Sequence, residues 1–182
     1  MSKSWYVGGV TALMFLGFTA TPWRSASALQ DRPQTAQRRH LFVKRTSAEL
    51  HRLPTMDSRV MLTADQTDGR YSIVDEEFKP GMQSYPGHMH TFHSETFLIL
   101  RGRMEWNVGG ETEVVGPGDL VYIPPDTPHA TKVLGDETVH AIMIYEPGGY
   151  ELGLRRRAGA TPGQRQVLME LGDVVPVAKR NQ

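Results

Sequence analysis

The chain has 182 residues, 39% of them hydrophobic, and its 20 basic and 20 acidic side chains leave no formal net charge. This length and composition predict one domain of modest size, and the charge balance gives no support for a nucleic-acid or membrane partner. Because the sequence has no cysteine, disulfides, thiolate metal sites and lipidated cysteines are excluded.

Residues 1–28 have the pattern of a secretory signal peptide. Lys3 precedes an apolar run from Trp5 to Ala20, and Ala26-Ser27-Ala28 matches a small-residue cleavage site. The apolar run is shorter than the about 20 residues that span a bilayer, which favours cleavage over an uncleaved anchor. We therefore expect a mature chain that begins at Leu29 and is exported to the periplasm or the extracellular space, with no membrane contact after cleavage.

Residues 29–53 are predicted to form a linker and a short helix. The composition is polar up to about Arg39, which is typical of a flexible segment. Thr46-Ser47-Ala48-Glu49 matches a capping box, and Pro54 would end the helix that it begins. We expect this helix to have a packing role rather than a catalytic one.

Residues 54–150 carry the signals of an antiparallel β-barrel. Two-residue turn sequences separate short strands at Asp68-Gly69, Gly109-Gly110 and Gly135-Asp136. Gly116-Pro117-Gly118-Asp119 suits a type II turn, which would lead into a buried strand. The predicted strands are 58–64, 70–78, 104–108, 111–115, 120–123, 129–134 and 137–145. Such short strands without intervening helices resemble a jelly-roll barrel, whose mouth can hold one ligand.

The richest chemistry lies between Gly87 and Glu95. His88 and His90 are two residues apart, so on a strand their imidazoles share a face. Glu95 lies five residues beyond His90, so the chain must turn through residues 91–94 before Glu95 can face the same point. His129, from a later stretch, supplies the fourth group. Three histidines and a carboxylate suit Fe, Mn, Co, Ni, Cu or Zn and leave room for exogenous ligands.

The two stretches resemble the paired motifs of the cupin superfamily. The first is His88-Met89-His90, four residues, Glu95, six residues and Gly102. The second is Gly118, five residues, Pro124-Pro125-Asp126, two residues and His129. Asp126 and Val133 stand where the family pattern has glycine and asparagine. The resemblance covers about residues 58–150, and the sequence is similar to single-domain cupins of the quercetin-dioxygenase type.

This resemblance implies one divalent transition metal ion, of unspecified identity, bound by His88, His90, Glu95 and His129, and no organic cofactor. It implies a dioxygenase that acts on a small aromatic or enolisable substrate, with Glu95 as the general base. A homodimer is consistent with the same family. Two alternatives stay open: a lyase, isomerase or decarboxylase that uses the metal as a Lewis acid, and a metal-binding or small-molecule-binding protein without enzymatic activity.

Other polar and aromatic residues have less specific interpretations. His93 falls in the predicted turn, so we expect it at the rim of the site or behind a ligand, and as the substitute ligand if Glu95 points away. His140 alternates with Ile142 and Ile144 and is predicted to be a hydrogen-bonded wall residue rather than a ligand. The candidates for the core are Phe97, Met104, Trp106, Tyr122 and Met143.

Residues 151–182 are predicted to form a helical tail. Thr161-Pro162-Gly163-Gln164 matches a capping box with proline at the first helical position, and Gly172 would end that helix over the barrel. Arg155, Arg156 and Arg157 are expected to form a solvated face. The predicted fold class is therefore all-β: an antiparallel jelly-roll barrel with short N- and C-terminal helices.

Overall fold

The computed structural model describes residues 40–160 and 174–176 of the chain. These residues form two antiparallel β-sheets and one short α-helix, which confirms the all-β jelly-roll architecture. The signal peptide predicted at residues 1–28, most of the linker and the helix predicted at residues 161–172 lie outside the described residues, so these features stay predictions.

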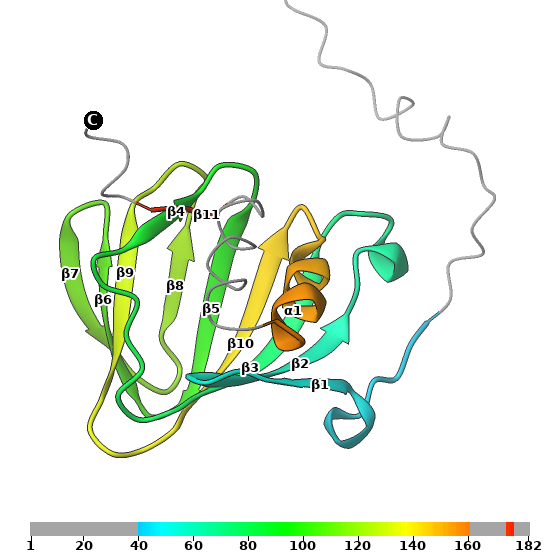
Figure 1. The fold of residues 1–182 in the computed structure, drawn as a ribbon, viewed down its shortest axis with the longest axis horizontal. Helices are drawn as coiled ribbons and strands as arrows, with labels where there is room; N and C mark the ends of the chain where they lie inside the picture. Colours follow the sequence, from blue (N-terminus) through cyan, green and yellow to red (C-terminus); the bar gives the residue numbers. More distant parts are fainter. Residues whose placement is uncertain (1–39, 161–173, 177–182) are drawn as a thin grey trace, which may run out of the picture. The chain divides into compact units, whose positions relative to one another are not determined.

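The strands follow one another along the two sheets in the order β1-β2-β3-β10-β5-β8 and β11-β4-β9-β6-β7 (Figure 1). Their bounds are β1 Glu49–Arg52, β2 Met56–Leu62, β3 Ser72–Phe78, β4 His88–His90, β5 Ser94–Arg101, β6 Arg103–Val108, β7 Glu111–Val115, β8 Leu120–Ile123, β9 His129–Leu134, β10 Val139–Glu146 and β11 Val174–Pro176. The strands predicted at 111–115, 120–123 and 129–134 have the observed bounds, and the others differ by up to two residues at an end.

Strict alternation of side chains builds the core between the sheets. On β10, Val139, Ala141, Met143 and Tyr145 are buried, and on β5 the inward residues include Phe97. Successive side chains of a strand point to opposite faces, so each strand contributes every second residue to the interior. Four of the five predicted core residues are buried in this way: Phe97, Met104, Trp106 and Met143.

Strand β8 departs from this pattern. Leu120 is 57% exposed and Tyr122 is 56% exposed, so neither belongs to the core. The strand lies at the edge of the larger sheet, where only β5 pairs with it. The prediction of a buried strand at residues 120–123, with Tyr122 in the core, is therefore wrong, because an apolar sequence does not distinguish an edge strand from a central one.

The N-terminal helix predicted from the capping box is also wrong. Arg45–Ser47 form a single 3-10 turn, and Glu49 then begins β1, which pairs with β2. The Glu49 carboxylate does not return to Thr46; it accepts hydrogen bonds from the guanidinium of Arg155 at 2.7 and 3.1 Å. Strand pairing and this ion pair override a weak helical signal, as tertiary contacts often do.

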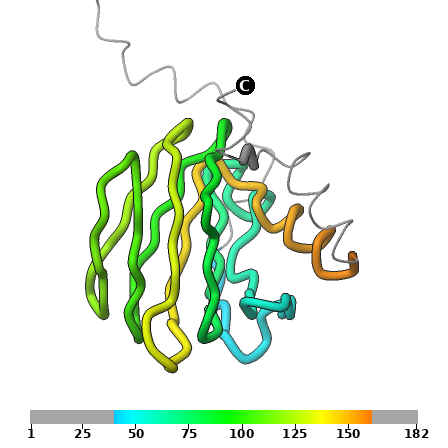
Figure 2. Tube along the Cα trace, turned by 60° about the vertical axis from the view of Figure 1, so that its left-hand side comes forward, coloured from blue at the N-terminus to red at the C-terminus, as the bar shows by residue number. Residues whose placement is uncertain are grey.

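The α-helix α1, Tyr150–Ala158, packs against β1 and β3, on the side of the barrel away from β6 and β7 (Figure 2). One face of α1 points toward the sheet, and it carries the side chains of Tyr150, Leu154 and Arg157 at helical spacing. Arg155 and Arg156 are exposed, but Arg157 is only 8% exposed. The expectation of a solvated face therefore fails for Arg157.

Within residues 40–160 and 174–176, no helix is long and apolar enough to cross a membrane.

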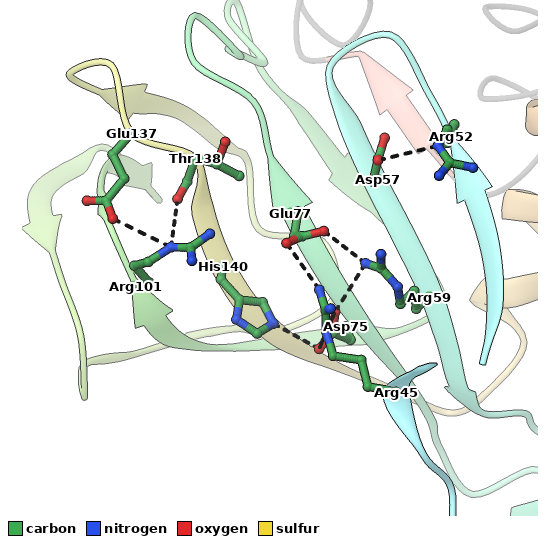
Figure 3. A network of polar contacts seen from close by, with 10 residues as sticks. All are labelled: Arg45, Arg52, Asp57, Arg59, Asp75, Glu77, Arg101, Glu137, Thr138 and His140. Atoms are coloured by element: carbon green, nitrogen blue, oxygen red, sulfur yellow. Dashed lines mark hydrogen bonds and ion pairs between the residues drawn. The ribbon is translucent and has the colours of Figure 1, made fainter. Parts of the chain in front are cut away.

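An ionic network covers the outer face of the larger sheet (Figure 3). The carboxylate of Asp75 lies 3.0 Å from Nε of Arg45 and 2.8 Å from Nε2 of His140, while Glu77 lies 2.9 Å from Nη1 of Arg59. His140 is thus hydrogen-bonded, as predicted, and points away from the interior residues of β10. The network ties the segment before β1 to β3 and β10.

Gly87, the glycine before the first motif, lies so close to the backbone of His129 that a side chain would not fit there. Gly87 has a φ of +110°, and a Cβ there would lie 2.8 Å from the backbone oxygen of His129. Gly118 also has a positive φ, +93°, but a Cβ there would meet no atom within 4 Å.

We expect Gly87→Ala to lower the free energy of unfolding by about 2–4 kcal/mol and Gly118→Ala by only about 1 kcal/mol. Urea unfolding of both variants measures the difference, and equal losses would show that the contact with His129 is unimportant.

Candidate metal centre

The predicted site residues come from both sheets. His88 and His90 lie on β4, and His129 begins β9, directly opposite His88 in the register of those two strands. Glu95 lies on β5 in the other sheet, on the inward face that it shares with Phe97 and Ile99. The alternation that buries the core of β5 therefore aims the carboxylate at the histidines.

The loops around the site have the conformations that these positions require. The chain turns between β4 and β5, as the spacing of His90 and Glu95 predicted. Asp126, which replaces the glycine of the second motif, adopts a left-handed φ of +60°, and its N–H donates to the carbonyl of His90 at 2.7 Å. Aspartate tolerates this conformation better than most residues. The departure from the motif therefore leaves His129 in place.

The four predicted residues meet in one cluster. Oε1 of Glu95 lies 3.2 Å from Nε2 of His90, and Oε2 lies 3.3 Å from Nε2 of His129. The candidate ligand atoms of His88, His90 and His129 all lie within 4.8 Å of one another, and those of His90, His93 and Glu95 do so as well. Two sets of three donor atoms, which share His90, are thus each compact enough to hold a metal ion.

His93 takes the second of its two predicted positions. It does not lie at the rim, because it is only 7% exposed, and its ring lies behind a proposed ligand, 4.3 Å from the ring of His90. Its Nε2 lies 3.9 Å from Oε1 of Glu95, so it belongs to the buried cluster. Because the chain between β4 and β5 is irregular, strand parity did not apply to this residue.

Hydrogen bonding prepares the histidines as ligands. Nδ1 of His129 lies 2.9 Å from the carbonyl oxygen of Thr127, which can only accept, so Nδ1 carries the proton. Nε2 of His129 is then directed at Glu95, but without the geometry of a hydrogen bond. Nδ1 of His90 is buried and likewise has no hydrogen-bond partner among the described residues. Buried polar atoms of this kind are rare unless water or an ion satisfies them.

The pKa shifts of His88 and Glu95 favour the protonation states that bind a metal cation: a neutral imidazole and an ionised carboxylate. Burial, together with the charges of His129 and His90, lowers the pKa of His88 to about 3, so its imidazole is neutral at physiological pH. Burial alone would raise the pKa of Glu95, but the contacts with His129, His90 and His93 outweigh it and hold that pKa well below the ordinary value. For His129, burial lowers the pKa, and the Glu95 carboxylate more than compensates and raises it. An ionised carboxylate surrounded by imidazoles fits a divalent transition metal, which would bind Nε2 of His129, the nitrogen that does not face the Thr127 carbonyl.

The cluster opens into a cavity of about 550 Å³ inside the barrel. Most of its wall is apolar or aromatic, with contributions from Phe78, Met82, Phe97, Trp106 and Met143. A cavity of this size and character is typical of a site for a small organic molecule.

Sequence reasoning missed the polar groups on another part of the wall. Glu76, Tyr145, Tyr150 and Arg157 also line the cavity. Alternation on β3 with the buried Val74 and Phe78 was a usable signal for Glu76, because it places that carboxyl among inward residues. The carboxyl of Glu76 is 1% exposed, and its Oε1 accepts a hydrogen bond from Oγ of Ser58 at 2.9 Å.

Comparison with known proteins supports this description. Residues 74–145 match the family model of the cupin domain. A stretch of 107 residues, 58% of the chain, is 31% identical to quercetin 2,3-dioxygenase from Bacillus subtilis, and the chain spans only 31% of the length of that relative.

Two solved structures show the same fold at low identity. KdgF from a Halomonas species has a TM-score of 0.55 and 18% identity, over 63% of this chain and 99% of its own. A predicted oxalate decarboxylase from Thermotoga maritima has a TM-score of 0.54 and 14% identity, over 59% of this chain and 99% of its own.

The buried Glu76 gives a testable pH dependence of stability. Burial raises its pKa from an ordinary 4.5 to about 7, so between these values the folded state binds more protons than the unfolded state. Stability must therefore fall as pH rises through this range. Glu76→Gln, which mimics the protonated acid, should gain stability relative to the parent protein between pH 5 and pH 8, by up to about 3 kcal/mol.

The matched control is Glu77→Gln on the same strand. Hydrogen bonding to Arg59 lowers the pKa of Glu77, so this carboxylate stabilises the fold above its ordinary pKa and should show no such gain between pH 5 and pH 8. Chemical unfolding at both pH values measures the two variants. The same pH profile for both would mean that Glu76 is not buried as the structure shows.

Proposed function

We propose that this chain, whose residues 74–145 match the model of the cupin domain, is a metal-dependent enzyme. We propose further that its reaction is the dioxygenation of a small aromatic or enolisable substrate. The observation that carries this proposal is the buried cluster of three histidines and a glutamate at the wall of an apolar cavity. The 31% identity to a quercetin 2,3-dioxygenase over 107 residues supports the choice of reaction.

His88, His90, His129 and Glu95 are the proposed metal ligands. Their candidate donor atoms are close together, and the neutral imidazole of His88 and the carboxylate of Glu95 are in the protonation states that ligation needs. When bound, the metal would supply a coordination position for a substrate oxygen and for dioxygen. His93 is the nearest replacement if Glu95 moves, since its Nε2 lies 3.9 Å from that carboxylate.

The cavity wall favours a substrate with a flat, apolar body. The rings of Phe97 and Trp106 pack at a centroid distance of 4.4 Å, and both line the cavity beside the histidine cluster. Aromatic faces and methionine side chains bind planar rings through dispersion and exclude water from them. The apolar wall therefore orients the substrate, and the polar cluster acts on its oxygen atoms.

Glu95 is the proposed general base. It is a carboxylate at neutral pH, because the contacts with the histidines outweigh the effect of burial on its pKa. A carboxylate with a low pKa accepts a proton poorly, so its contacts with His90 and His129 must lengthen when it takes the proton of a substrate hydroxyl. Loss of those contacts inside a buried site would raise the pKa of Glu95 toward that of a useful base.

The ligand assignment predicts the metal content of histidine variants. His88→Ala, His90→Ala and His129→Ala should each lower the bound metal at least about tenfold, because each removes one of only three imidazole ligands. His140→Ala is the matched control: it removes a histidine on the outer face that bonds Asp75. Elemental analysis of purified protein gives the result. A His129→Ala protein that binds as much metal as the parent would contradict the four-ligand site.

If Glu95 is the general base, its replacement should lower the reaction rate much more than the metal content. Glu95→Gln keeps the shape of the side chain and leaves three imidazoles, so a good part of the metal should remain. The rate should fall by about two to four orders of magnitude, the usual contribution of a positioned base. Oxygen-electrode recording with flavonol, catechol and dicarbonyl panels measures the turnover.

The same recording tests the class of reaction. A dioxygenase consumes oxygen in proportion to the substrate that it converts. Turnover without oxygen uptake would instead identify a lyase, isomerase or decarboxylase, and tight binding without turnover would identify a binding protein.

A further inference from the structure

The helix α1 directs a buried cation into the cavity. The guanidinium of Arg157 lies over the ring of Tyr150, with Cζ 5.0 Å from the ring centroid, and Tyr150 stacks on Tyr145 at 3.7 Å. The ring of Tyr145 in turn meets the ring of His93 edge to face at 5.3 Å. Arg157 therefore belongs to the same continuous wall as the histidine cluster, and all of these residues except His93 line the cavity directly.

The charge of Arg157 lacks a carboxylate partner. Among residues 40–160 and 174–176, no carboxylate oxygen lies within 4.0 Å of its guanidinium nitrogens. Arg155 on the same helix shows the ordinary arrangement: at the surface, it forms a two-nitrogen contact with the Glu49 carboxylate. Arg157 as a residue is only 8% exposed, and it forms no such ion pair within the described part of the chain. Buried cations are normally paired, so this one points to an anion that comes from outside the described chain.

Glu76, which lines the same cavity, is a candidate for an internal partner, but its own contacts argue against that role. Its Oε1 is occupied by the hydroxyl of Ser58, and Oε2 is buried with no hydrogen-bond partner among the described residues. Since burial raises the pKa of Glu76 to about 7, near neutrality it carries less negative charge than an ordinary carboxylate. The cavity wall therefore carries the cationic guanidinium of Arg157 and, on Glu76, an Oε2 atom without a hydrogen-bond partner among the described residues.

On the basis of the proposed function, we propose that Arg157 determines substrate specificity by binding a carboxylate of the substrate. The substrate is then an aromatic or enolisable acid, with its ring or chain against the apolar wall and its carboxylate on the guanidinium. The planar fork of arginine matches a carboxylate with two parallel hydrogen bonds. The ring of Tyr150 lies under the guanidinium, with Cζ 5.0 Å from its centroid, and restricts the positions that the guanidinium can take.

Calorimetric titration of metal-free protein tests this inference. The probes are benzoate and cinnamate, with benzamide and cinnamamide as uncharged molecules of the same shape. The parent protein should bind each carboxylate at least about 10-fold more tightly than its amide, as expected for a buried charge-assisted pair. In Arg157→Met, which keeps the apolar stem over Tyr150, this preference should fall to less than about 2-fold, because the charged donor is gone.

Arg156→Met is the matched control, since it removes the same charge from an exposed position one residue away and should retain the full preference. If Arg157→Met does not fold, Arg157→Lys replaces it. That variant keeps the charge but loses the fork, and should weaken carboxylate binding at least about 3-fold with amide binding unchanged. A parent protein that binds neither carboxylate or shows no preference for them, or an Arg157 variant that keeps the parent preference, would overturn the proposal.

The titration separates this inference from the proposed reaction. It uses metal-free protein, so its result does not depend on oxygen chemistry. Arg157-dependent carboxylate binding without oxygen uptake by the metal-loaded enzyme would overturn the dioxygenase and support the carboxylate site. Oxygen uptake with an uncharged substrate, at a rate unaffected by Arg157→Met, would support the dioxygenase and overturn the carboxylate site.

Discussion

The carboxylate of Glu95 is buried at 4% exposure between two sheets, and the arrangement around it follows from the need to compensate that charge. An ionised carboxylate removed from water costs several kcal/mol unless cations or donors surround it. Here the compensating groups are imidazoles from the opposite sheet, with His90 and His129 at 3.2 and 3.3 Å. The same contacts join β5 to β4 and β9, so the site and the packing of the sheets depend on one interaction.

The interior has two polar regions within a mostly apolar wall. One is the histidine cluster with Glu95, and the other comprises Arg157 and Glu76 beside the stacked rings of Tyr145 and Tyr150. The first region suits a metal ion, and the second has an excess of positive charge that an acidic ligand would neutralise. A molecule that contacts both regions is held by its polar groups and oriented by its apolar body, which is how small-molecule sites usually achieve specificity.

The sequence was sufficient for the fold and the ligand cluster because both depend on short periodicities. Alternation on β5 and β10 determines which residues face inward, and the spacing of His88, His90 and Glu95 requires one turn, which the structure contains. It was insufficient where a side chain finds its partner far along the chain. Glu49 belongs to a strand because β2 and Arg155 stabilise it there, and Arg157 is buried because α1 folds back onto β3. Neither long-range contact has a local signal.

The central claim is that three imidazoles and one carboxylate of this chain form a single metal site. X-ray absorption spectroscopy at the edge of the metal that the protein carries from its native compartment tests it most directly. We expect a first coordination shell of nitrogen and oxygen at about 2.0–2.2 Å, with the outer-shell scattering of three histidine rings. In the His140→Ala protein the spectrum should be unchanged, and in the His129→Ala protein one ring should be lost. A shell of oxygen atoms alone, or the scattering of three histidine rings unchanged in the His129→Ala protein, would contradict the account.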